Sequence, residues 1–306
     1  MKIFKNRGDF YIPKADYKKS KEEIILKSLL AVIIILTIIF IALLSHKYSS
    51  VSQFFGEGEV TTTQLFVDDQ ELPKISGKTN YLVFETDDEK RTIHYIFLVQ
   101  ADKDSKAYKI CSLSPKTKID NETITEIYLN GGGASLQTKL TEYFGFEIDC
   151  YAGFENSSFV EFATKMGNII YTSNEEIRFS GGSGDDKYTI HINEGDQNIT
   201  GKELSNLLRY YSEEKKNYSL ENETVLFALT QLFNEDNYED CDSLFRLFIK
   251  SASSNITVRN FENSKDALNF FCKRNTDITL YSACAEYEKN VLSQKSIKEI
   301  KGYFSK

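Results

Sequence analysis

One long apolar run near the start of the chain differs from all the others. Residues 24–44, IILKSLLAVIIILTIIFIALL, are apolar or weakly polar apart from Lys27, and about 20 such residues cross the ~30 Å apolar layer of a bilayer. Lys27 lies one turn inside the run, where its long side chain reaches the interface. The run is longer than the apolar core of a secretory signal peptide, and its end matches a cleavage site poorly. It predicts one uncleaved transmembrane helix.

Three short apolar runs follow a polar segment at 45–79, which we interpret as an extracellular stalk. The runs are YLVFET, IHYIFLVQ and AYKICSLS, within residues 81–114. Each is rich in Val, Ile, Tyr and Phe, and charged or turn-forming residues separate them, which predicts strands. Because they do not alternate cleanly, we expect strands that are covered on both faces.

Helical patterns and further strands fill the remainder of the chain. Apolar residues three and four apart predict helices at 124–130 and 134–144, with Gly131, Gly132 and Gly133 as a break between them. Further helices are expected at 157–167, 201–211, 223–233, 241–252, 264–271 and 296–304. The segments 168–179 and 187–193 flank SGGSGDD and predict a long hairpin. Thr200 and Glu203 have the spacing of a capping box.

This order predicts the fold class and the domains. Strands interleaved with helices, without an internal repeat, indicate one α/β domain with a mixed sheet covered by helices. We expect this domain at 80–306, preceded by a cytoplasmic tail at 1–23, the transmembrane helix at 24–44 and the stalk at 45–79.

Charge predicts how the chain is placed in the membrane. Through Lys27 the chain carries eight positive and four negative side chains, so the remainder has a net charge of −8 − 4 = −12. By the positive-inside rule, the N-terminus is cytoplasmic and the domain is extracellular, in a single-pass protein of the cell membrane. An acidic exported domain argues against nucleic acid as a partner. The five cysteines fit no zinc spacing, and both a Cys272–Cys284 disulfide and buried free thiols are consistent with the sequence.

Three stretches resemble a known family in residue type, order and spacing. They are ITEIYLNGGGASLQTKL, EIDCYAGFENSSFVEFATKMGNI and ITGKELSNLLRYY. Together with the short tail and the single span, they resemble the LytR-CpsA-Psr proteins of the bacterial cell envelope. The resemblance covers roughly residues 80–304.

The resemblance implies an activity. Proteins of this family transfer a glycopolymer from a polyprenyl-pyrophosphate carrier to peptidoglycan, form a phosphodiester and use Mg²⁺. Such chemistry needs arginines that hold pyrophosphate and acidic residues that hold the metal ion. It also implies an apolar tunnel between sheet and helices for the lipid.

The first family motif is altered here. Where the family has Arg-Ser-Asp-Thr, this chain has Arg91-Thr92-Ile93-His94. By the resemblance, Arg91 is a candidate catalytic residue and His94 a candidate substrate contact. An ungapped register counted back from Val99 instead places His94 at the Asp position and Thr92 at the Arg position. Asp87 retains the acid of the preceding motif and is the candidate metal ligand.

Three later motifs are altered as well. Lys116 lies in the segment that corresponds to the family's Pro-Arg-Asp-Thr motif, and by the resemblance it is a candidate substrate contact. Arg209 matches the first arginine of an Arg-x-Arg pair and is the second candidate catalytic residue, whereas the second position is Tyr211, also a candidate substrate contact. Glu221 occupies an arginine position, where its carboxylate would repel a phosphate.

Each of these assignments has a plainer alternative. His94 also fits a neutral, hydrogen-bonded histidine at the end of a strand, and the acidic residues at 87–89 also fit a solvated loop. Arg209 also fits a surface salt bridge, and Asp185 and Asp186 fit turn chemistry alone. Three functions follow: a phosphotransferase, a catalytically inactive module that binds a polyprenyl-linked glycan, and an unrelated envelope scaffold.

Overall fold

The computed structural model describes residues 74–305, and in it the chain folds around a six-stranded sheet with strand order β11-β6-β1-β2-β3-β12. These strands are β1 (Lys78–Thr86), β2 (Ile93–Asp102), β3 (Ala107–Leu113), β6 (Cys150–Glu155), β11 (Ala252–Ser254) and β12 (Thr279–Ser282). β1, β2 and β3 are antiparallel neighbours, whereas β6 runs parallel to β1 and β12 parallel to β3. The predicted mixed sheet is confirmed.

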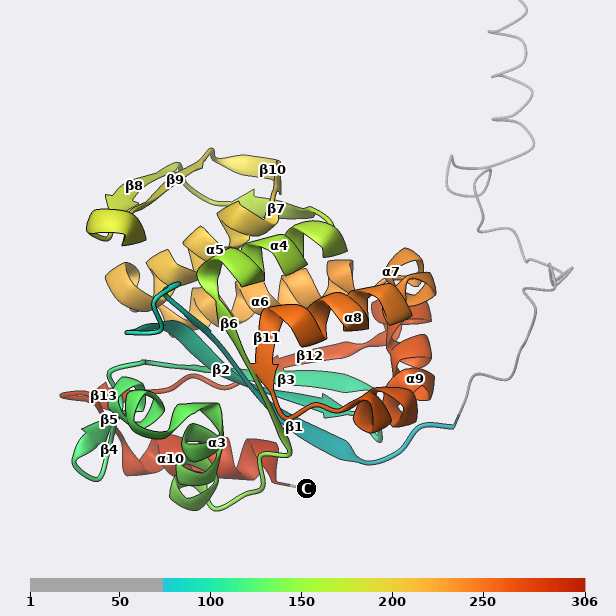
Figure 1. Ribbon diagram of the computed structural model, residues 1–306, viewed down its shortest axis with the longest axis horizontal. Coiled ribbons are helices and arrows are strands. Elements are labelled where there is room, and N and C mark those ends of the chain that lie inside the picture. The colour runs from blue at the N-terminus through green and yellow to red at the C-terminus, as the bar shows by residue number, and fades with distance from the viewer. Residues whose placement is uncertain (1–73, 306) are drawn as a thin grey trace, which may run out of the picture. The chain divides into compact units, whose positions relative to one another are not determined.

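Helices cover both faces of this sheet (Figure 1). They are α3 (Ile124–Phe144), α4 (Asn156–Met166), α5 (Gly201–Arg209), α6 (Tyr218–Leu232), α7 (Glu235–Glu239), α8 (Cys241–Ser251), α9 (Val258–Lys273) and α10 (Gln294–Phe304). α3 and α10 pack on one face, and α4, α5, α6 and α8 lie across the other. Central strand β2 is buried almost throughout, because each face of the sheet meets a layer of helices.

Two-stranded sheets lie outside the central one. They pair β4 (Lys118–Ile119) with β5 (Glu122–Thr123), β7 (Ile169–Ser173) with β10 (Gly195–Ile199), β8 (Ile177–Gly181) with β9 (Tyr188–Ile192), and β13 (Tyr287–Glu288) with β14 (Val291–Leu292). The predicted long hairpin is therefore shorter than expected. β8 and β9 form it, with the 3-10 turn η1 (Gly184–Asp186) at its tip, whereas β7 pairs with β10.

Local sequence accounts for the helix boundaries. The expected glycine break is a kink inside α3, where Gly132 has a φ of 67°, a conformation that glycine adopts without strain. The Thr200–Glu203 capping box begins α5 as predicted. α5 continues into a π-helical turn, η2 (Tyr210–Lys215), and a 3-10 turn, η3 (Asn275–Asp277), follows α9.

Several predictions concern the N-terminal part of the chain or the cysteines. Among residues 74–305, no helix combines the length and the apolar character that a membrane span requires. The predicted span at 24–44 lies outside the described residues, as do the tail and most of the stalk. β1 begins at Lys78, two residues before the expected domain boundary at 80. Cys272 and Cys284 are free thiols and form no disulfide with each other.

Candidate functional site

A large apolar cavity lies between the sheet and the helices of the α4–α5–α8 face. Its volume is about 800 Å³, and side chains from β1, β2, α4, α5, α8 and α9 line it, among them Val83, Phe97, Phe159, Leu204, Phe248 and Phe271. Cavities of this size accommodate small molecules and lipid chains, and an apolar lining favours an apolar ligand. The predicted apolar space between sheet and helices is therefore present, and this counts against the hypothesis of an unrelated scaffold.

A buried polar cluster adjoins this cavity, and an irregularity in the sheet creates it. Glu85 pairs with Tyr95, but the next pair joins Thr86 to Ile93, so β2 has one extra residue, His94. Such a bulge turns two consecutive side chains toward the same face. Ile93 packs in the apolar cluster on the α3 side, whereas His94 and Tyr95 both contact Glu85.

Glu85 is fully buried and is surrounded by hydrogen-bond donors. Its Oε2 accepts hydrogen bonds from the Tyr95 hydroxyl at 2.7 Å and the Ser205 hydroxyl at 2.8 Å. Its Oε1 accepts from Asn156 Nδ2 at 3.0 Å and lies 3.1 Å from His94 Nδ1. Burial, with the Glu85 carboxylate as a second cause, raises the pKa of the Tyr95 hydroxyl well above its ordinary value. Burying a carboxylate costs less free energy when such partners satisfy its oxygens.

Arg209 is the centre of a second part of the cluster. The residue is 5% exposed, and its guanidinium donates from Nη1 to Asp186 Oδ1 at 2.8 Å and from Nη2 to Asp186 Oδ2 at 2.6 Å. Nε donates to Glu213 Oε2 at 2.9 Å. Burial opposes its charge, but Asp186 and Glu213 outweigh burial and raise the pKa of Arg209. This is the bidentate geometry by which arginine binds carboxylates and phosphates.

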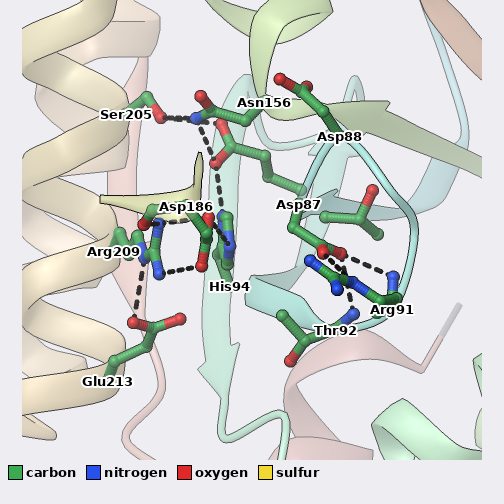
Figure 2. Close-up of polar contacts among 12 residues, drawn as sticks. Asp87, Asp88, Arg91, Thr92, His94, Asn156, Asp186, Ser205, Arg209 and Glu213 are labelled. Atoms are coloured by element: carbon green, nitrogen blue, oxygen red, sulfur yellow. Dashed lines mark hydrogen bonds and ion pairs between the residues drawn. The ribbon is translucent and has the colours of Figure 1, made fainter. Parts of the chain in front are cut away.

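His94 faces the same Asp186 carboxylate from the sheet. Its Nε2 lies 3.2 Å from Asp186 Oδ1, an ion-pair distance, without the geometry of a hydrogen bond. Figure 2 shows the Asp186 carboxylate between Arg209 and His94. The Arg209 guanidinium from α5 and the His94 imidazole from β2 thus both face the Asp186 carboxylate, which lies in the η1 turn. The plainer interpretation of Arg209 as a surface salt bridge is wrong, because this arginine is buried.

Helix α5 joins the cavity to the polar cluster. Leu204 and Leu208, one turn apart, line the cavity, whereas the adjacent pair Ser205 and Arg209 contacts the cluster. Residues four apart lie on one face of a helix, so α5 presents an apolar stripe and a polar stripe side by side. Tyr95 marks the boundary, with its hydroxyl on Glu85 and its ring against two rings of the cavity wall, Phe97 and Phe159.

Asp87 and Arg91 form a separate pair within the β1–β2 loop (Figure 2). Asp87 Oδ1 accepts from the backbone N–H groups of Arg91 at 2.6 Å and Thr92 at 2.9 Å, and Oδ2 accepts from Arg91 Nε at 3.2 Å. Burial alone would raise the pKa of Asp87, but these hydrogen bonds from Thr92 and Arg91 lower it. The Arg91 side chain is 65% exposed and also contacts Glu89. This loop is therefore ordered by its own charges.

The two remaining predicted contacts lie in other surroundings. Lys116 is exposed, and its backbone N–H donates to the Ser114 hydroxyl. Tyr211 is buried, its hydroxyl is 2.8 Å from that of Tyr171, and burial raises its pKa. Of the predicted residues, the structure thus brings together Arg209 and His94, and it pairs Asp87 with Arg91 in the loop.

Sequence reasoning missed several members of the cluster. They are Glu85, Tyr95, Asn156, Asp186, Ser205 and Glu213. An acidic residue at the end of the apolar run YLVFET is a signal that could have identified Glu85, because a buried strand carboxylate needs partners. Asp186 gave no such signal, since glycine-rich turns commonly contain aspartate.

The carboxylates of this region do not fit a magnesium site. Mg²⁺ prefers oxygen ligands in near-octahedral geometry, but both oxygens of Asp87 accept hydrogen bonds within its loop. Glu85 faces donors on every side, and Arg209 holds Asp186 and Glu213. Among residues 74–305 no group of three acidic, His or Cys side chains is arranged to hold a metal.

Comparison with known proteins assigns the family. The model described as the LytR_cpsA_psr family matches residues 62–223, more than half of the chain. The chain therefore belongs to the LytR-CpsA-Psr family. No curated protein sequence matches it at a significant level.

Solved structures share its fold. A protein from Eubacterium siraeum DSM 15702, described as a transcription regulator, has a TM-score of 0.65 at 17% identity, over 81% of this chain and 98% of that one. B. subtilis TagV has a TM-score of 0.59 at 15% identity, over 74% of this chain and 96% of that one. TagT bound to LI-WTA has a TM-score of 0.54 at 13% identity, over 74% and 88%. At these identities the likeness shows the fold alone.

Proposed function

We propose that this protein binds a glycopolymer carried on polyprenyl pyrophosphate and transfers it to peptidoglycan. The single observation that carries the proposal is the apolar cavity that adjoins a buried arginine. The cavity, about 800 Å³ in volume, would take the polyprenyl chain, and Arg209 would hold the pyrophosphate. The solved relative TagT, bound to LI-WTA, supports this choice of ligand class.

The transfer itself is a phosphoryl substitution. A hydroxyl oxygen of the peptidoglycan acceptor attacks the sugar-linked phosphorus, the bond from that phosphorus to the bridging oxygen breaks, and polyprenyl phosphate leaves. The hydroxyl proton passes to the leaving phosphate or to water. Arg209 would stabilise the negative charge on the phosphate oxygens, which is where electrostatic catalysis of this reaction acts.

The proposal includes the membrane placement that the sequence predicts. A single span at 24–44 with a cytoplasmic N-terminus would place the domain outside the cell, where peptidoglycan lies. Protease treatment of intact cells and of inverted membrane vesicles tests this. The domain should be cleaved in cells and protected in inverted vesicles, and the reverse result would overturn the placement.

A ligation assay with the full-length protein in detergent micelles tests the activity. A polyprenyl-pyrophosphate glycan and peptidoglycan are supplied, and release of polyprenyl phosphate is measured. We expect Arg209→Ala to lower the rate by about 100-fold, the loss typical for a group that stabilises transition-state charge. Arg246→Ala is the matched control, because Arg246 is exposed on α8, and its rate should equal that of the unchanged protein.

The inactive binding module is the second candidate function, and one specific observation favours it. The charged groups of the polar cluster and of the β1–β2 loop already bind one another: Arg209 holds Asp186 and Glu213, and Asp87 holds Arg91. Such a module would bind the carrier lipid without turnover. Tight binding together with no release of polyprenyl phosphate would favour this candidate over the transferase.

A further inference from the structure

We propose that the turn of the β8–β9 hairpin, residues 181–187, is a displaceable lid whose Asp186 carboxylate fills the anion site made by Arg209 and His94. A phosphate group of the carrier would then bind only after Asp186 leaves. This inference rests on the proposed function. It adds a way in which the protein controls access of the carrier phosphate to Arg209 and His94.

Asp186 occupies the site as a ligand would. Both of its oxygens accept from the Arg209 guanidinium, at 2.8 and 2.6 Å, and its backbone carbonyl accepts from Nη1 at 3.2 Å. Phosphate binds arginine through the same pair of parallel hydrogen bonds. The carboxylate and an external phosphate would therefore compete for the same nitrogen atoms.

The site also has a binding capacity that Asp186 leaves unused. His94 is fully buried, and its Nε2 makes no hydrogen bond although it is aimed at Asp186. A buried polar atom without a hydrogen bond costs free energy, so a ligand that formed a hydrogen bond with Nε2 would be favoured. A phosphate has more oxygens than a carboxylate, and it could accept from Arg209 and, when both ring nitrogens of His94 carry a proton, from His94 Nε2 as well.

Arg209 would stay in place when Asp186 leaves. Its Nε donates to Glu213 Oε2 at 2.9 Å, within the same helical segment, so the guanidinium keeps one fixed partner. His94 is likewise held on its other side, with Nδ1 3.1 Å from Glu85 Oε1. The two groups that would meet a phosphate are thus oriented independently of the turn.

The turn has the features of a segment that can move. Gly182 and Gly184 have φ values of 73° and 61°, a region that glycine enters without the strain of other residues. Residues 182–185 are exposed. Asn206 Nδ2 donates to the Thr189 carbonyl at 3.0 Å and ties the base of the hairpin to α5. The tip therefore moves by breaking the contacts of Asp186 while β9 stays attached.

Calorimetric titration of the full-length protein in detergent micelles tests the lid. Inorganic pyrophosphate is titrated first, and farnesyl pyrophosphate in a second series. We expect Asp186→Asn to tighten both by about tenfold, because a competitor that closes the site most of the time reduces apparent affinity in proportion. Asp185→Asn is the matched control: Asp185 is the neighbouring exposed carboxylate, and its removal should change neither affinity.

The possible results separate this inference from the function on which it rests. Equal affinities for Asp186→Asn and the unchanged protein, with loss in Arg209→Ala, would overturn the lid and keep the proposed function. No binding by any variant would overturn both.

Hydrogen–deuterium exchange of the unchanged protein gives an independent reading that needs no variant. Pyrophosphate should raise the exchange of residues 181–187, and an unaltered rate in the presence of bound pyrophosphate would overturn the lid.

Discussion

Two aspartate–arginine pairs lie in this part of the molecule, and they differ in what they join. Asp87 and Arg91 are four residues apart in one loop, and the arginine is 65% exposed. Asp186 and Arg209 join a hairpin tip to a helix across 23 residues, and the arginine side chain is 6% exposed. The first pair shapes a loop, whereas the second closes a buried anion site. The two pairs differ in burial and in sequence separation. Residue type alone does not show this difference, because both pairs consist of an aspartate and an arginine.

The largest expected effect on stability comes from replacing Arg209, and the comparison is with replacing Arg91. Arg209→Ala leaves Asp186 and Glu213 without their cation in a largely buried place, and this should lower the free energy of unfolding by about 2–4 kcal/mol. Arg91→Ala removes an exposed pair and should cost about 0–1 kcal/mol. Urea denaturation of the full-length protein measures both. Equal losses would show that the two pairs do not differ as described.

A buried carboxylate without a cation extends the comparison. Glu221 is fully buried, neither of its oxygens has a hydrogen-bond partner among the described residues, and burial raises its pKa well above the ordinary value, an effect that nearby Ser112 only partly offsets. The folded state therefore keeps a proton that the unfolded state releases above about pH 4.3, so stability falls as pH rises.

Glu221→Gln should remove this pH dependence. At pH 8 the variant should be more stable than the unchanged protein by on the order of 1–3 kcal/mol, because glutamine neither has to keep a proton nor buries a charge. The difference should shrink as pH falls toward about 4.3, the unfolded pKa of glutamate. Denaturation midpoints across this range measure it, and a difference that does not vary with pH would contradict the assignment.

Asp87 should show the opposite dependence and a smaller effect. Hydrogen bonds from Thr92 and Arg91 lower its pKa, so its contribution is complete above its unfolded pKa of about 3.9 and is lost as pH falls through the lowered folded value. Asp87→Asn should cost about 1 kcal/mol at pH 7, in line with the net value of a hydrogen bond. A cost that stays constant below pH 3 would contradict this account.

The sequence was informative about the fold because the fold depends on local patterns. The runs that became β1, β2 and β3, the capping box of α5 and the glycine kink in α3 all follow from neighbouring residues. The strand partner of β7 was not predictable in this way, because β7 pairs with β10 beyond an intervening hairpin.

The site was less accessible to sequence reasoning for the same reason. Family resemblance identified Arg209 and His94, but their shared partner Asp186 comes from a turn that resembles many others. Glu85 becomes the centre of the cluster only through the bulge at His94, which depends on strand register. Asp87 and Arg91 are predicted from the resemblance to serve chemistry, and the structure pairs them with each other.

The most direct test of the central claim is to compare a polyprenyl pyrophosphate with the matching polyprenyl alcohol as ligands of the full-length protein. If the apolar cavity takes the lipid and Arg209 takes the pyrophosphate, calorimetry will give at least about tenfold tighter binding of the pyrophosphate, since a charge-assisted hydrogen bond contributes about 1.5–3 kcal/mol. Arg209→Ala will remove that advantage and leave binding of the alcohol unchanged. Equal affinities for the two lipids in the unchanged protein would contradict the account.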